Sequence, residues 1–323
     1  MTKPKYAAGF HIFGPLPDRY LSTGYHATLP IEERFERIAK VKSIEGIELA
    51  YGTFANRETI GGYRNLIQKL GLKVVCLSAN VTGNIRFGKG SLTNPDPAIR
   101  REAIALVQET MNAAADMDVP IINLWMGQEG FDYIMETDYT EIWKIFVDGL
   151  RQCAQVQPKV RLCVEYKSKE PRSRSLPNSS AQALLLVKET GCDNLAVTLD
   201  IGHAIMAAEN PSQAMLLLHQ YKKLGYLHLN DNYGDWDWDM AAGMNNWWQL
   251  IEFCYWLQEI NFNDYLTLDV APFRQSPEDM CNTCTEAINR AWDLAEKIDR
   301  SKAKEIFAAR DGLAALRMLM DLR

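Results

Sequence analysis

Short apolar runs alternate with longer amphipathic segments along most of the chain. The runs are rich in apolar and β-branched residues and end in polar loops, which predicts buried strands. The segments place apolar residues at three- and four-residue intervals, which predicts helices. The predicted strands are Tyr6–Ile12, Gly46–Ala50, Leu72–Ser78, Ile121–Trp125, Val160–Tyr166, Leu195–Asp200, Lys223–Leu229 and Tyr265–Val270.

The order of these elements indicates the fold class. Eight strands, each followed by a helix and buried rather than alternating in composition, predict a closed parallel α/β structure, the (β/α)8 TIM barrel. The clearest helices are predicted over Asp96–Ala115 and Tyr139–Ala154. An open doubly wound sheet is the alternative, but it normally carries a glycine-rich phosphate turn after its first strand. Phe13–Pro17, which reads Phe-Gly-Pro-Leu-Pro, cannot serve as one.

The chain length fits one barrel with an appendage. It has 323 residues, whereas such a barrel uses roughly 250, and no Pro-, Gly- or Ser-rich linker divides the sequence. We expect residues 1–300 to form the catalytic barrel and residues 301–323 a C-terminal helical extension. Ser301–Arg323 is predicted to form one amphipathic helix whose apolar face packs on its own barrel or on another subunit. Interface candidates in a homo-oligomer, a tetramer or dimer, are Phe307, Leu313 and Leu316.

Composition narrows the class of partner. The apolar fraction of 47% and charged fraction of 24% are those of a globular protein and exclude disorder. The net charge of −6 argues against a nucleic-acid partner and against an anionic membrane. We find no apolar run of about 18 residues and no signal-like N-terminus, so we expect a soluble, cytoplasmic protein. Seven cysteines give no disulfide framework, and the single CxxC, Cys281 to Cys284, lacks a second pair for zinc.

Ionisable residues fall at the ends of consecutive predicted strands. The fifth strand carries Glu165 near its end, the sixth ends in Asp200, the seventh contains His228, and the eighth carries Asp269. Barrel strands meet at their C-terminal ends, where three carboxylates would repel one another unless a cation lay between them. Any one of these residues alone could cap a helix, and His11 on the first strand could be a core histidine. Their occurrence on four strands in a row favours a metal site.

A second group of possible ligands follows the sixth and seventh strands. His203 lies three residues after Asp200, and the loop after His228 is acidic. Carboxylates with one or two imidazoles suit Mn²⁺ or Mg²⁺, with Co²⁺ also possible, better than structural zinc. One or two ions per subunit are expected, although the acidic loop could also be a solvated surface. Its candidate ligands are Asp235, Asp237 and Asp239.

Several stretches between about residues 70 and 270 resemble the xylose isomerase-like barrel enzymes, in particular xylose isomerase and L-rhamnose isomerase. As a set they are specific, although each alone would be weak. One difference is that the second strand, at Ile47–Tyr51, lacks the histidine that xylose isomerase has there. The matching stretches are Thr93–Arg101, Leu124–Gly130, Val164–Pro171, Leu199–Ala204, His228–Asp231 and Asp237–Asp239.

The resemblance implies roles for these residues. Lys167 would hydrogen-bond the carbonyl oxygen of a sugar, Trp125 would pack against the sugar backbone, and His203 would contact the substrate. The resemblance implies catalytic roles for Lys167, Glu165, Asp200 and His203. A structural metal would be held by Glu165, Asp200, His228 and Asp269. A second, catalytic metal would be held by His203, Asp237 and Asp239, with Asp235 as a competing ligand.

The expected activity is therefore a metal-dependent aldose–ketose isomerisation. Hydrogen would move between C1 and C2 of an open-chain sugar by hydride shift, on a pentose such as apiose or xylose or a 6-deoxyhexose such as rhamnose. The nearest alternative is a ketose 3-epimerase of the same superfamily, which uses one metal and two glutamates; Asp269 stands where it would have a glutamate. A phosphodiesterase or endonuclease on the same barrel is more distant, because it needs more histidines and a basic surface. The alternative outside enzymes is a metal-binding scaffold.

Overall fold

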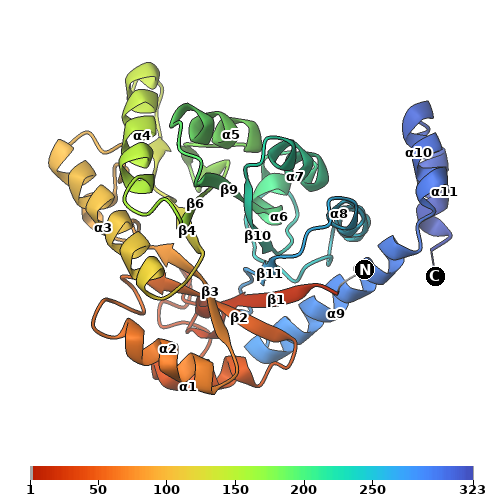
Figure 1. The fold of residues 1–323 in the computed structure, drawn as a ribbon, viewed down its shortest axis with the longest axis horizontal. Coiled ribbons are helices and arrows are strands. Elements are labelled where there is room, and N and C mark those ends of the chain that lie inside the picture. Colours follow the sequence, from red (N-terminus) through yellow and green to blue (C-terminus); the bar gives the residue numbers. More distant parts are fainter. Residues whose placement is uncertain (1–2, 323) are drawn as a thin grey trace.

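A closed parallel barrel forms the centre of the molecule, as the sequence predicts (Figure 1). The computed structural model describes residues 3–322. Around the barrel the strands follow the order β1-β11-β10-β9-β6-β4-β3-β2. These strands are β1 (Lys5–Gly9), β2 (Ile44–Tyr51), β3 (Lys73–Ala79), β4 (Ile121–Trp125), β6 (Arg161–Glu165), β9 (Leu195–Asp200), β10 (Leu224–Leu229) and β11 (Tyr265–Leu268). A small separate sheet contains β5 (Gly130–Phe131), β7 (Lys169–Glu170) and β8 (Ser173–Ser175).

Helices surround the barrel, and several begin where a polar cap is available. Asp96 accepts a hydrogen bond from the backbone N–H of Ala98 at 2.8 Å, so α3 starts at the proline that follows. No helix among residues 3–322 is both long and apolar enough to cross a membrane. The helices are α1 (Ile31–Ala39), α2 (Ile60–Lys69), α3 (Pro97–Asp116), α4 (Tyr139–Ala154), α5 (Ser180–Glu189), α6 (Ile201–Met206), α7 (Pro211–Gln220), α8 (Trp247–Glu259), α9 (Pro277–Glu296), α10 (Arg300–Ala309) and α11 (Gly312–Met320).

The first predicted strand is wrong over its second half. β1 ends at Gly9, and Phe10–Phe13 form a 3₁₀ helix, η1. Its side chains Phe10, Ile12 and Phe13 are buried, so the apolar run continues although the backbone has changed. A short buried run does not separate strand from helix by its periodicity. In consequence His11 lies at the barrel mouth, partly exposed and beside Asp269, and is not a core histidine.

Strand register brings the polar strand ends to one level. Parallel pairing places His228 opposite Asp200, and Trp125 opposite Glu165. β4 and β9 have the predicted boundaries, and the other strands apart from β1 differ from theirs by at most two residues at either end, which is the usual uncertainty at element ends. Side chains at the C-terminal ends of β4, β6, β9 and β10 therefore converge at the same mouth.

The C-terminal extension consists of two helices, so the predicted single helix is wrong. Arg310 adopts a left-handed conformation with φ of 52°, and Asp311 then caps α11 through the N–H groups of Leu313 and Ala314. Phe307 on α10 stacks on Trp256 of α8, with ring centroids 5.5 Å apart. In Figure 1 the two helices stand beside α8, away from the barrel axis. None of the described residues of α11 is buried.

We expect α11 to contribute to a homo-oligomer. Leu313 and Leu316 are 66% and 44% exposed, so burial against another subunit would remove apolar surface from water. The double variant Leu313→Asp/Leu316→Asp should lower the molar mass measured by light scattering at micromolar concentration. Leu185→Asp, on an exposed leucine of α5, should leave the molar mass unchanged. A wild-type chain that is already monomeric would contradict the expectation.

Candidate metal centre

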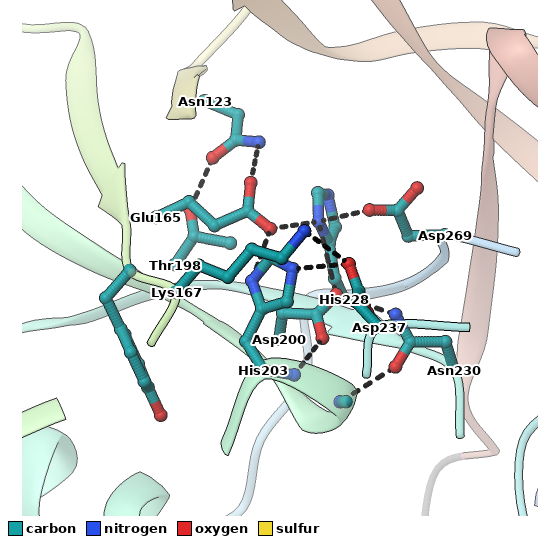
Figure 2. A network of polar contacts seen from close by, with 12 residues as sticks. Asn123, Glu165, Lys167, Thr198, Asp200, His203, His228, Asn230, Asp237 and Asp269 are labelled. Carbon is teal, nitrogen blue, oxygen red and sulfur yellow. Dashed lines mark hydrogen bonds and ion pairs between the residues drawn. The ribbon is translucent and has the colours of Figure 1, made fainter. Parts of the chain in front are cut away.

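Four ionisable side chains meet at the barrel mouth (Figure 2). Glu165 and Asp200 are the last residues of β6 and β9, His228 lies on β10, and Asp269 follows β11 directly. Their ligand atoms lie within 4.8 Å of one another. His228 Nδ1 is 3.2 Å from Glu165 Oε1, 3.2 Å from Asp269 Oδ2 and 3.9 Å from Asp200 Oδ2. The four side chains that were predicted at neighbouring strand ends therefore lie together. Their role as metal ligands stays a prediction.

Asp200 both caps a helix and faces the donor group. Its Oδ1 accepts a hydrogen bond from the N–H of His203 at 2.8 Å, which starts α6. Its Oδ2 accepts from Asn230 Nδ2 at 2.9 Å, and Asn230 Oδ1 in turn accepts from the N–H of Gly202 at 2.7 Å. A Cβ at Gly202 would lie only 2.4 Å from Asn230 Oδ1, so this close approach requires glycine. The capping interpretation and the ligand interpretation of Asp200 are thus compatible.

A second donor group shares Asp200 with the first. Asp200, His203 and Asp237 also bring one ligand atom each within 4.8 Å of the others. His203 Nε2 lies 3.0 Å from Asp237 Oδ2, and both side chains are buried. Asp239 is not a member of this group, and its Oδ1 accepts a 3.4 Å hydrogen bond from Asn230 Nδ2, which also bonds Asp200.

The competing ligand Asp235 is held outside this group. Its side chain is exposed and its Oδ1 accepts a hydrogen bond from Trp238 Nε1 at 2.8 Å. That bond holds the pKa of Asp235 below its usual value. Asp237 instead belongs to the second donor group, whereas Asp239, the other ligand preferred from the sequence, does not.

The imidazole of His228 offsets the negative charge of the carboxylates around it in the first group. Burial alone would lower the pKa of His228, but Glu48, Glu165 and Asp269 outweigh it and raise that pKa well above its usual value. Burial alone would raise the pKa of Asp269, but the neighbouring His228 and His11 outweigh it and hold that pKa well below its usual range. The donor group is therefore arranged around positive charge.

The second group is less well balanced. Burial, partly offset by His203, raises the pKa of Asp200 to about 7. Burial and then the charge of Asp237 raise the pKa of Asp239 well above its usual value. Burial would lower the pKa of His203, but Asp200 and Asp237 raise it to about 10. Burial and neighbouring carboxylates thus raise the pKa of Asp200 and Asp239, and a divalent cation between the carboxylates would relieve their repulsion.

Lys167 lies between two indole rings and two carboxylates. Its ammonium nitrogen is 5.4 Å from the ring centroid of Trp125 and 5.3 Å from that of Trp236. It forms an ion pair with Asp237 Oδ2 at 2.9 Å and another with Glu170. Burial opposes the charged form, but the two carboxylates raise the pKa of Lys167 above its usual value. Lys167 is therefore a fixed cation at the edge of the second donor group.

Glu48 is part of this network and was missed from the sequence. It lies on β2, is 7% exposed, and its Oε2 is 2.8 Å from His228 Nε2. Burial acts to raise the pKa of Glu48, but the charge and hydrogen bond of His228 and the hydrogen bond from Ser78 together lower it below its usual value. By binding Nε2 it leaves Nδ1 to face the donor group. A glutamate between apolar residues in the middle of the predicted strand Gly46–Ala50 was the available signal, because a glutamate is almost never buried unless it is paired.

The residues present fit a divalent metal. Asp237 Oδ1 is buried without a hydrogen-bond partner, which is costly unless another group binds it, and His203 Nδ1 makes no hydrogen bond although Glu165 Oε1 lies 3.4 Å away. Asn123 orients the Glu165 carboxylate, because Glu165 Oε2 accepts a hydrogen bond from Asn123 Nδ2 at 2.7 Å. Carboxylate oxygens with imidazole nitrogens, supported by such outer hydrogen bonds, are typical of Mg²⁺, Mn²⁺ or Co²⁺ sites.

Comparison with known families agrees with the barrel and with the resemblance. Residues 35–282 match the family model described as "Xylose isomerase-like TIM barrel". The chain belongs to this family.

Curated relatives are similar over part of their length. The xylose isomerases of Ruegeria sp. (strain TM1040) and Rhizobium rhizogenes (strain K84 / ATCC BAA-868) are each 25% identical over 207 residues. The alignments cover 62% of this chain and 48% of each relative. The chain thus spans about half the length of the curated relatives that it matches.

Solved structures match over nearly the whole chain. A structure of L-ribulose 3-epimerase has a TM-score of 0.70 at 16% identity and covers 96% of this chain and 99% of its own. D-psicose 3-epimerase with D-tagatose, from Clostridium cellulolyticum H10, has a TM-score of 0.64 at 17% identity and covers 92% and 98%. At such identities the likeness shows the fold alone.

Replacing Glu48 by Gln should weaken metal binding. The amide can still bond His228 but no longer stabilises the imidazole electrostatically, and loss of such an outer partner typically costs about 10–100-fold in affinity. Calorimetric titration of metal-stripped protein with Mn²⁺ measures this change. Glu45→Gln, on an exposed glutamate of the same strand, is the matched control and should bind as the wild type does. Equal affinities for the two variants would show that Glu48 does not support the site.

Proposed function

We propose that this chain is a metal-dependent aldose–ketose isomerase acting on a free sugar in its open-chain form. The coarser assignment, a sugar isomerase or epimerase, follows from the family. The finer one rests on a single observation, the second donor group of Asp200, His203 and Asp237 beside the first. Two adjacent groups that share one carboxylate suit two divalent ions, Mn²⁺ or Mg²⁺, better than one.

The chain's own residues would have distinct tasks. Divalent ions in these groups would supply Lewis-acid polarisation of the sugar carbonyl and of the neighbouring hydroxyl. Lys167 is placed to donate a hydrogen bond from Nζ to the carbonyl oxygen and to stabilise negative charge that develops there. The faces of Trp125 and Trp236 on either side of Lys167 would exclude water and pack against the sugar backbone. The unpartnered Asp237 Oδ1 could accept a hydrogen bond from a sugar hydroxyl.

A ketose 3-epimerase is the second candidate, and by name the solved structures support it better than the isomerase. L-ribulose 3-epimerase and two structures of D-psicose 3-epimerase are among the whole-length matches. Epimerisation needs a proton acceptor and a proton donor on opposite faces of one carbon. Asp269, one methylene shorter than glutamate, pairs with both His228 and His11, which makes it a poor base. For this reason we place the isomerase first.

Removing the second donor group should separate binding from turnover. Asp237→Ala/Asp239→Ala should leave the first group intact, so Mn²⁺ titration should lose one binding event and keep the other. Sugar affinity, measured by calorimetry, should persist, whereas kcat should fall by about 100-fold or more because the lost groups act mainly in the transition state. Asp235→Ala, the exposed neighbour, is the control. Normal turnover in the double variant would contradict a two-ion isomerase.

Isotope labelling distinguishes the two reactions. Mn²⁺-loaded protein is incubated with aldoses carrying deuterium at C2, including xylose, rhamnose and apiose, and with ketoses in deuterated water. A direct hydride shift keeps the C2 label in the product, and NMR should find it at C1. An epimerase would instead incorporate deuterium at C3 of a ketose with no exchange between C1 and C2. The second pattern would replace the isomerase by the epimerase.

A further inference from the structure

The mouth of the barrel has two lobes of opposite character. One cavity of about 1160 Å³ lies over the loops that follow β1, β10 and β11. We call it the aromatic lobe, and it is lined by Tyr20, Tyr25, Tyr233, Trp236, Trp238 and Phe273. The other, of about 1320 Å³, lies over the loops after β3, β4 and β6. We call it the polar lobe; its lining includes Lys89, Gln128, Asp132, Glu136, Glu141 and Arg172.

The aromatic lobe reaches Asp237 of the second donor group, and the polar lobe reaches the neighbours of Lys167. Asp237 and Asp239 line the aromatic lobe, Trp125 and Glu170 line the polar lobe, and Pro171 borders both. A sugar whose carbonyl end lies beside Lys167 would therefore extend into one of them. Pockets for drug-sized ligands measure about 300–1,000 Å³. The aromatic lobe alone exceeds that range, so it has room for more than one monosaccharide.

Two of the aromatic rings, those of Tyr25 and Trp238, are held in place by contacts within the lobe. Tyr25 donates a hydrogen bond to Asp18 Oδ2 at 2.9 Å and packs edge-on against Phe273, with ring centroids 5.3 Å apart. Asp18 Oδ1 accepts the backbone N–H of Tyr20 at 2.8 Å. The indole N–H of Trp238 is fixed by Asp235. Binding there would need little further ordering, which favours affinity.

The loops are also tied to one another. The N–H of Ala271 donates to the carbonyl of Asp239 at 2.8 Å, and His26 Nε2 lies 2.6 Å from the carbonyl oxygen of Pro272. Segments after β1, β10 and β11 thus form one surface. Despite this fixation Tyr20 and Tyr233 remain 78% and 64% exposed. Large apolar side chains gathered at an open cavity next to a reaction centre indicate a binding surface.

We propose that the aromatic lobe binds a second sugar ring, so that the preferred substrate is a reducing sugar carrying a glycosyl substituent on the end remote from its carbonyl. This rests on the proposed function. Flat aromatic faces suit the C–H faces of a pyranose, and the amphipathic rings of Tyr and Trp also keep a polar group at the edge. Arg274 and Gln275, both exposed and lining the same lobe, supply hydrogen bonds for ring hydroxyls.

Substrate pairs test this proposal on the Mn²⁺-loaded full chain. Xylose is compared with xylobiose, and glucose with cellobiose, by kcat/KM and by binding, which is followed through tryptophan fluorescence. We expect at least one disaccharide to exceed its monosaccharide by tenfold or more in kcat/KM. Tyr20→Ala/Tyr233→Ala should reduce disaccharide affinity by about tenfold, the loss expected for two aromatic contacts. Tyr221→Ala, an exposed tyrosine after α7 that lines neither lobe, should not reduce it.

The outcomes separate this proposal from the proposed function. Monosaccharide turnover with no advantage for either disaccharide overturns the second-ring site and leaves the isomerase standing. Disaccharide binding that Tyr20→Ala/Tyr233→Ala weakens, without conversion of any sugar, supports the site and refutes the isomerase. If a benzyl ether at the same hydroxyl binds and the glycosyl group does not, the lobe takes an apolar substituent and the proposal is wrong. It is equally wrong if the double variant changes only the molar mass in solution, because the surface is then a subunit contact.

Discussion

The crowding of buried carboxylates around His228 is the constraint on which the rest of the site depends. Glu48, Glu165 and Asp269 all lie within 3.2 Å of an atom of this one imidazole. Removing one partner from a buried ion pair typically costs about 3–5 kcal/mol, because the other charge is left uncompensated. None of these positions can therefore change alone without cost. Outer groups such as Asn123 and Asn230 belong to the same balance, since each orients a carboxylate that would otherwise turn away from its neighbours.

The barrel provides what this constraint requires. Parallel strands in register bring side chains from β6, β9, β10 and β2 to one level, although Glu48 and His228 are 180 residues apart in the chain. The helices around the barrel supply the buried apolar area that offsets the cost of the polar centre. Loops after the strands are free to differ, and here they build one aromatic and one polar lobe.

Site residues that follow a recognisable strand could be predicted from the sequence, whereas contacts between residues far apart in the chain could not. Strand ends carrying Glu165, Asp200, His228 and Asp269 could be predicted, because each follows a recognisable apolar run. Glu48 could not be assigned to the site from such a rule, since it lies inside its strand and its partner His228 is far along the chain. The choice between Asp235 and Asp237 depended on one hydrogen bond from Trp238. The pairing of Glu48 with His228 in particular has no local signature, because the two residues are 180 positions apart.

The two errors in local structure have a related cause. The apolar run through Phe10 and Ile12 is buried in a 3₁₀ helix as fully as it would be in a strand, so burial preserved the pattern while the backbone changed. At the C-terminus the helical pattern continues across Arg310, but Asp311 offers a side-chain cap that restarts the helix. The first error has a consequence for the site. Ending β1 at Gly9 turns the chain so that His11 Nε2 reaches Asp269 Oδ1 at 3.0 Å, which adds a second imidazole to that carboxylate and removes it from the groups available as a free base.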